Sequence, residues 1–253
     1  MEKSYNNLKI IIRDNYDDAS AAAADIIAGF VTANPNGVLG LATGSTPEGA
    51  YAKLIEANKA GKLSFSRITT FNLDEYYPIQ KSNNQSYDYF MRNKLFNHID
   101  INPANIHLPN GETTDPQTEC AAYEAKIVAA GGIGLQLLGI GPTGHIGFNE
   151  PAPVFPRATN YVELHAGTIE ANARFFENYN QVPKHALTMG IGTIFAAKQI
   201  LLVVTGAHKA DIIEKAIFGD IDPQISASIL QLHPNTTLVM DTAAATKVLA
   251  KLK

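Results

Sequence analysis

Two short segments carry the side chains that enzymes use to move protons. Asp74 and Glu75 are adjacent carboxylates just past the predicted strand 68–71, from which Asn72 and Leu73 separate them. A carboxylate at a partly apolar strand end can have a raised pKa and act as a general base, although a solvated loop acid is the commoner role. His145 and Glu150 form a second titratable pair in a proline-rich segment. A carboxylate can orient an imidazole and raise its pKa, so this pair could also transfer a proton.

The segment 43–47, Thr-Gly-Ser-Thr-Pro, has the composition of an anion-binding loop. Gly44 lets the backbone approach a ligand, Ser45 and Thr46 supply hydroxyl groups, and free N–H groups at a helix start favour phosphate. The alternative is an ordinary strand-to-helix turn with Thr46 as the N-cap, and the residues leave both open. Lys209 starts a predicted helix, where a positive charge opposes the helix dipole, and this indicates an anionic partner.

The segment from Gly139 to Gly144 matches the G-x-G-x-x-G pattern of dinucleotide-binding loops. We reject that interpretation because the pattern needs a helix directly after it, and here the proline-rich stretch that begins at His145 follows. The glycines are instead expected to open space beside His145. Of the seven histidines only His145 lies in such a loop, and the other six are assigned to surface, capping or packing roles.

Short apolar runs alternate with helical patterns along most of the chain, which predicts an α/β fold. The predicted strands are residues 9–12, 38–42, 68–71, 135–140, 200–204 and 237–240. The predicted helices are residues 19–31, 47–58, 86–99, the stretch from Asp115-Pro116 to Gly131-Gly132, 209–217 and 242–252. We expect a Rossmann-like, mainly parallel sheet with helices on both faces, in a single catalytic domain over residues 1–253. An irregular active-site loop at 141–160 and a lid-like segment at about 151–180 interrupt the alternation.

Polar clusters follow four of the predicted strands, at 43–47, 72–75, 141–145 and 205–209. Because ligands of parallel sheets bind at the carboxyl ends of the strands, these clusters are expected to meet at one edge of the sheet.

The composition excludes several classes of protein. The 253 residues are 45% hydrophobic and carry a net charge of −4, which excludes disorder and disfavours nucleic-acid binding. One cysteine cannot form an internal disulfide. The N-terminus resembles no signal peptide and no stretch is long enough to span a membrane, so we expect a cytoplasmic protein.

The ordered segments resemble the glucosamine-6-phosphate deaminase/isomerase family along nearly the whole chain. The matching segments are LGLATGSTPEGAY, FNLDEYYPI, SYDYFMRNKLFNHIDI, GHIGFNEP, ANARFF, VPKHALTMGIGTI, LLVVTGAHKA and LQLHP. The resemblance implies hydrolytic deamination coupled to aldose–ketose isomerisation of a small amino-sugar phosphate, glucosamine 6-phosphate, to fructose 6-phosphate and ammonium, without a cofactor or metal.

The resemblance also implies roles for residues. Asp74 would move a proton between C2 and C1, and His145 would assist ring opening with Glu150 tuning it. Thr143 stands where many relatives have an acid. The phosphate would be bound by Gly44, Ser45, Thr46, Arg174 and Lys209.

Three alternatives stay open at this point. 6-Phosphogluconolactonases resemble the same fold but lack the continuation from Asn149 to Pro151. A galactosamine-6-phosphate deaminase would differ only in the shape of its pocket. A sugar-phosphate-sensing domain of a transcription regulator would need a DNA-binding module, for which residues 1–8 leave no room. A monomer and a homo-oligomer are both compatible with the sequence.

Overall fold

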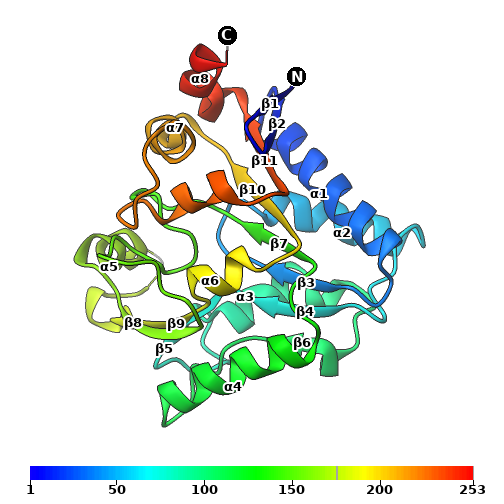
Figure 1. The fold of residues 1–253 in the computed structure, drawn as a ribbon. Helices are drawn as coiled ribbons and strands as arrows, with labels where there is room; N and C mark the ends of the chain where they lie inside the picture. The colour runs from blue at the N-terminus through cyan, green and yellow to red at the C-terminus, as the bar shows by residue number, and fades with distance from the viewer. Residues whose placement is uncertain (175, 253) are drawn as a thin grey trace.

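The computed structural model describes residues 1–174 and 176–252, so Phe175 of the ANARFF segment and Lys253 lie outside the described residues. Within this part of the chain, eight strands form the main sheet in the order β1-β2-β11-β10-β7-β3-β4-β6 (Figure 1). These strands are β1 (Glu2–Tyr5), β2 (Leu8–Arg13), β3 (Val38–Leu41), β4 (Thr69–Asn72), β6 (Ile106–His107), β7 (Leu135–Leu138), β10 (Gln199–Val204) and β11 (Thr236–Asp241).

All neighbouring strands of the main sheet run parallel except β1 and β2, which are antiparallel. Every residue of β3 and β7 is buried, as expected for strands that are covered on both faces. The prediction of a mainly parallel sheet is confirmed, and each of the six predicted strands is present. The sequence reading missed β1 and β6 because they are short edge strands without a continuous apolar run.

The helices of the described residues are α1 (Tyr16–Ala33), α2 (Glu48–Lys59), α3 (Tyr87–Lys94), α4 (Pro116–Ala129), α5 (Ala166–Ala173), α6 (Ile191–Phe195), α7 (Ala210–Phe218) and α8 (Thr242–Lys251). Short 3₁₀ helices are η1 (Phe96–His98), η2 (Pro103–Asn105), η3 (Tyr179–Gln181), η4 (Ala207–Lys209) and η5 (Ser226–Leu232). None of the helices in this part of the chain has the length and apolarity needed to cross a membrane.

Helices cover both faces of the main sheet. Figure 1 shows α1 and α2 packed together on one side and α7 and α8 packed together on the other. The start of α4 was predicted from its cap: the Asp115 side chain accepts a hydrogen bond from Thr118 N, and Pro116 is the first helical residue. Helices α5 and α6 were not predicted, because both are short.

A second, antiparallel sheet lies beside the carboxyl ends of the main sheet and was not predicted. Its order is β5 (Asp74–Tyr77), β9 (His185–Thr188) and β8 (Asn160–Glu163). Its strands are four residues long and mix polar with apolar residues, so they give no clear periodic signal. The segment 151–180, expected to be lid-like, contributes β8 and α5.

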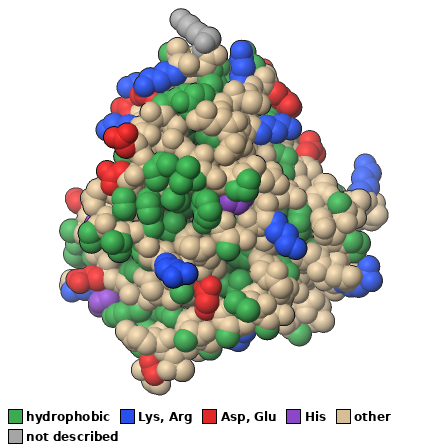
Figure 2. Space-filling model, viewed as in Figure 1, with side chains coloured by type: hydrophobic (Ala, Val, Ile, Leu, Met, Phe, Trp, Pro, Cys, Tyr) green, Lys and Arg blue, Asp and Glu red, His purple; other side chains and the backbone are tan. Residues whose placement is uncertain are grey.

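The small sheet has its own apolar cluster, formed by Tyr76, Ile79, Phe148, Leu164 and Ala186. Charged side chains are scattered over the surface. On the face shown in Figure 2, Lys and Arg side chains are interspersed with Asp and Glu rather than gathered into one basic area.

Candidate active site

The sheet order places the four polar clusters at neighbouring strand ends. Strands β10, β7, β3 and β4 lie side by side and parallel, so the segments that follow them leave the sheet at the same edge. The chain continues from β3 outward to β4, and from β7 in the opposite direction to β10. The position between β3 and β7 is therefore a topological switch point, where open α/β sheets form ligand crevices. The loops 43–47 and 141–150 flank it.

Asp74 is a buried residue of β5, which agrees with the interpretation as an acid of raised pKa at a strand end and not with the alternative of a solvated loop acid. Its side chain is 7% exposed, and burial together with the charge of Glu75 raises the pKa of the Asp74 carboxyl to about 8. A Cβ at Gly147 would lie 3.5 Å from Asp74 Oδ2, so the loop that carries His145 approaches this carboxylate closely. The location on a strand of the small sheet explains the burial.

Glu75 caps the N-terminus of α3. Its carboxylate accepts hydrogen bonds from the backbone N–H groups of Tyr76 (2.9 Å), Tyr87 (2.8 Å) and Asp88 (2.9 Å). Burial raises the pKa of Glu75 to about 7, and these N–H groups oppose the rise. Two adjacent buried carboxyl groups with raised pKa values are typical of sites that transfer protons.

His145 is held by Thr143. Thr143 Oγ1 lies 2.7 Å from His145 Nδ1, and the loop is closed by Gly141 N, which donates to His145 O at 2.8 Å. The ring lies against Gly141, where a Cβ would stand 2.0 Å from His145 Nε2. This close approach explains the need for glycine at 141 and agrees with the expectation that a glycine opens space for the imidazole.

The pKa of His145 differs from the sequence-based expectation. Burial lowers this pKa to about 4; the Glu150 charge opposes the effect, and the charges of Lys209 and His165 reinforce it. The Glu150 charge does raise the His145 pKa, as expected, but the net shift is downward because desolvation outweighs the carboxylate. The imidazole is neutral at pH 7.

Glu150 makes its hydrogen bonds with α5 rather than with His145. Its carboxylate accepts from His165 N at 2.6 Å and from the Thr168 hydroxyl, and Nδ1 of His165 lies 3.9 Å away. The expectation that Glu150 orients the His145 ring is wrong, because the Thr143 hydroxyl contacts Nδ1 of the ring and Glu150 does not. The sequence reading assigned His165 to a peripheral role and did not single out Thr168.

The loop 43–47 is an open turn. Gly44 has φ +94°, and no atom lies within 4 Å of a Cβ built there. Thr46 is not the N-cap of α2: that position belongs to Pro47, and no side chain caps the helix. The alternative that Thr46 caps an ordinary turn is therefore wrong, and the residue at the N-cap position offers no side-chain acceptor to the first N–H groups of α2.

Tyr16 of α1 fixes this loop and was missed by the sequence reading. Its hydroxyl donates to Ser45 O and accepts from Gly49 N, both at 2.9 Å. The two contacts span 29 and 33 residues along the chain, so no local pattern could have indicated them.

The two cations predicted at the site lie at helix ends. Lys209 ends η4 and is the N-cap of α7, and burial lowers the pKa of its amine. Arg174 is the C-cap of α5. Tyr87 was also missed: its side chain interacts with Tyr76 and with Thr43 of the loop. Among the described residues, no three His, Cys, Asp or Glu side chains are grouped to hold a metal ion.

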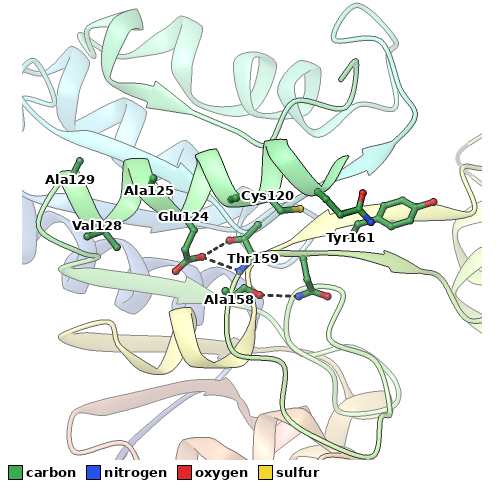
Figure 3. Close-up of a pocket in the computed structure, with 11 residues that line it drawn as sticks. Cys120, Glu124, Ala125, Val128, Ala129, Ala158, Thr159 and Tyr161 are labelled. Atoms are coloured by element: carbon green, nitrogen blue, oxygen red, sulfur yellow. Dashed lines mark hydrogen bonds between the residues drawn. The ribbon is translucent and has the colours of Figure 1, made fainter. Parts of the chain in front are cut away.

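A separate cavity of about 790 Å³ lies between α4 and residues 158–161 (Figure 3). Glu124 of α4 reaches across it and accepts from Thr159 N (2.9 Å) and Thr159 Oγ1 (2.8 Å). None of the residues predicted at the site lines this cavity. We therefore place the candidate active site at the β3–β7 switch point and not here.

Comparison with known proteins identifies the family of this chain. Residues 14–239 match the sequence model of the family described as glucosamine-6-phosphate isomerases/6-phosphogluconolactonase. The glucosamine-6-phosphate deaminase of Clostridioides difficile (strain 630) is 51% identical over 241 residues, which are 95% of this chain and 97% of that protein. The glucosamine-6-phosphate deaminase of Lachnoclostridium phytofermentans is 52% identical, covering 92% of this chain and 98% of its own.

Two solved structures resemble this chain to different degrees. A monomeric glucosamine-6-phosphate deaminase has a TM-score of 0.91 and 43% identity, covering 94% of this chain and 99% of its own. The 6-phosphogluconolactonase from Trypanosoma brucei has a TM-score of 0.73 and 19% identity, covering 94% and 98%. The second likeness concerns the fold alone.

Proposed function

This chain belongs to the glucosamine-6-phosphate isomerase/6-phosphogluconolactonase family, and we propose that it converts glucosamine 6-phosphate and water to fructose 6-phosphate and ammonium. The observation that carries the proposal is the 51% identity to a glucosamine-6-phosphate deaminase over 95% of this chain. The likeness to 6-phosphogluconolactonases, at 19% identity, gives no comparable support for lactone hydrolysis.

Ring opening is assigned to His145. The C1–O5 bond breaks as a proton moves from the C1 hydroxyl to the ring oxygen, so the step needs a group that accepts and then returns a proton. His145 is neutral because burial lowers its pKa to about 4, and a neutral imidazole can accept that proton. In our assignment Nδ1–H donates to the Thr143 hydroxyl, which leaves the lone pair of Nε2 for the sugar.

Isomerisation is assigned to Asp74. The ionised carboxylate takes the proton from C2 of the open-chain amino aldose while O1 gains a proton, which gives an enolamine. The Asp74 carboxyl then delivers its proton to C1 and the nitrogen gives up a proton, which leaves an imine at C2; in sum one proton moves from C2 to C1 and one from nitrogen to O1. Water then adds to C2 and ammonia leaves, which gives the ketose. A raised pKa of about 8 makes Asp74 a stronger base than an ordinary carboxylate while it is still ionised to a useful extent near neutral pH.

The phosphate is assigned to the loop 43–47 and two cations. Backbone N–H groups at the start of α2, apart from Gly49 N, which donates to Tyr16, would offer donors to phosphate oxygens together with the hydroxyls of Ser45 and Thr46. Lys209 and Arg174 would supply the positive charge that a dianion needs. Each of these roles is part of the proposal.

The test measures ammonium release from glucosamine 6-phosphate by the purified protein and by Asp74→Asn. We expect release by the wild type and a loss of about 10²–10⁴-fold in Asp74→Asn, the usual contribution of a general base. Galactosamine 6-phosphate, assayed in parallel, establishes which epimer is preferred. Hydrolysis of 6-phosphogluconolactone with no ammonium release between about pH 6 and 9, the range that spans the pKa values of Glu75 (about 7) and Asp74 (about 8), would overturn the proposal.

A further inference from the structure

Helix α5 is weakly packed compared with the helices on the main sheet. None of its described side chains is fully buried, whereas α1 buries seven residues. An element with few buried apolar contacts opens easily unless other contacts hold it. The position of α5 therefore depends on the contacts at its two ends.

The N-terminus of α5 is tied to the candidate catalytic loop. Glu150, which is 8% exposed, accepts hydrogen bonds from His165 N at 2.6 Å and from the Thr168 hydroxyl. His165 is the N-cap residue, and its side chain makes no capping hydrogen bond, so Glu150 replaces the usual cap. A carboxylate is well placed here, because the first N–H groups of a helix have no partner within the helix.

Helix α5 also contacts the strand that carries Asp74. Ile169 packs on the apolar cluster of the small sheet, and the Asn172 side chain interacts with the hydroxyl of Tyr76. The ring of Phe176, just beyond the helix, lies 5.9 Å from the ring of Tyr76. Helix α5 thus joins the loop of His145 to β5.

Arg174 stands at the end of this helix. Eight residues of α-helix span about 12 Å, so a change of tilt at Glu150 is transmitted along α5 to its C-cap. Charge-assisted hydrogen bonds such as those to Glu150 are the stronger class of hydrogen bond and hold a definite geometry.

We infer that Thr168 is a positioning residue: with Glu150 it fixes α5 in the orientation that directs Arg174 toward the phosphate of the substrate. The inference rests on the proposed function, in which the site binds a sugar phosphate. Glu150 has two roles in this inference: its charge acts on His145, and its hydrogen bonds hold α5. Thr168 takes part only in holding α5, so a Thr168 variant tests that role separately.

The experiment compares wild type with Thr168→Val, which removes the hydroxyl, and with Thr168→Ser, which keeps it. Thr246→Val, at an exposed threonine of α8, is the matched control. KM and kcat for glucosamine 6-phosphate, the inhibition constant of inorganic phosphate, and hydrogen exchange of residues 164–174 are measured. In Thr168→Val we expect KM and the phosphate constant to rise about 5- to 10-fold, with kcat nearly unchanged. Exchange in α5 should accelerate, while Thr168→Ser and Thr246→Val should resemble wild type.

A fall in kcat with unchanged KM would overturn the inference, because Thr168 would then act on the chemical step. Unchanged exchange in Thr168→Val would also overturn it. If the wild type releases no ammonium, the proposed function fails separately, and calorimetric phosphate binding with hydrogen exchange still decides whether Thr168 fixes α5. Equal phosphate affinity in wild type and Thr168→Val would then contradict the inference.

Discussion

Thr143 Oγ1 lies 2.7 Å from His145 Nδ1, while the Glu150 carboxylate hydrogen-bonds to His165 and Thr168. A neutral hydroxyl therefore orients the imidazole, and the carboxylate in the same loop acts on it only through space. This arrangement keeps His145 uncharged, because burial of the ring is not offset by a hydrogen-bonded anion.

Removing the Thr143 hydroxyl should impair the chemical step. In Thr143→Val the ring loses the partner of Nδ1, so we expect kcat to fall about 10- to 100-fold with KM little changed. Thr143→Ser keeps the hydroxyl and is the control. Steady-state kinetics on glucosamine 6-phosphate measure the effect, and equal kcat values for Val and Ser would show that the hydroxyl does not orient the catalytic ring.

Glu75 should set the pH range of the reaction. As the base, Asp74 works only when ionised, so kcat/KM should rise with pH up to a pKa of about 8. Glu75→Gln removes the adjacent negative charge, which lowers the Asp74 pKa and moves the acidic limb of the profile to lower pH. Asp88, Tyr76 and Tyr87 also lie near Glu75 and are unchanged in this variant.

The control for this pH profile is Glu163→Gln, which neutralises an exposed carboxylate on β8. Its profile should match that of the wild type. A Glu75→Gln profile that does not move, or that moves to higher pH, would contradict the assignment of Asp74 as the base.

Asp74 should also make the folded protein less stable at high pH. Its pKa is raised from 3.8 to about 8 in the folded state, so between these values the folded state binds more protons than the unfolded state. Stability from this group is therefore present at low pH and is lost as pH rises toward 8. His145 has the opposite slope below pH 6.5, so the comparison must be with Asp74→Asn.

We expect the melting temperature of Asp74→Asn minus that of the wild type to increase from about pH 5 to about pH 9. Thermal unfolding followed by circular dichroism measures this difference. A difference that is constant over this range would mean that the Asp74 pKa is not raised. Because the variant is expected to fold at least as well as wild type above pH 8, its loss of activity can be ascribed to chemistry.

Tyr16 should affect substrate binding rather than the chemical step. Tyr16→Phe removes the hydroxyl that contacts Ser45 O and Gly49 N, so the loop 43–47 loses its hydrogen bond to Tyr16 of α1. We expect KM to rise about 3- to 10-fold with kcat nearly unchanged, the effect of losing one to two hydrogen bonds. Tyr179→Phe changes an exposed tyrosine of η3 and is the control. An unchanged KM would remove Tyr16 from the list of positioning residues.

The strands of the main sheet and the order of the segments around the site could be predicted from the amino-acid sequence. Continuous apolar runs such as 200–204 predict buried parallel strands, because a strand that is covered on both faces has no polar side. The loop 43–47 and the segment 141–150 were recognisable because each directly follows such a strand. Parallel strands then require these loops to lie at one edge.

The pairing of the side chains at that edge could not be predicted, because it depends on how distant segments pack together. Burial of Asp74 depends on the small sheet, whose strands come from residues 74–77, 160–163 and 185–188 and show no periodicity of their own. Glu150 accepts hydrogen bonds from His165, 15 residues later, and from Thr168, 18 residues later. The partner of Ser45 is a tyrosine 29 residues earlier. Hydrogen bonds and desolvation depend on distances between segments, and these distances exist only once the chain has folded.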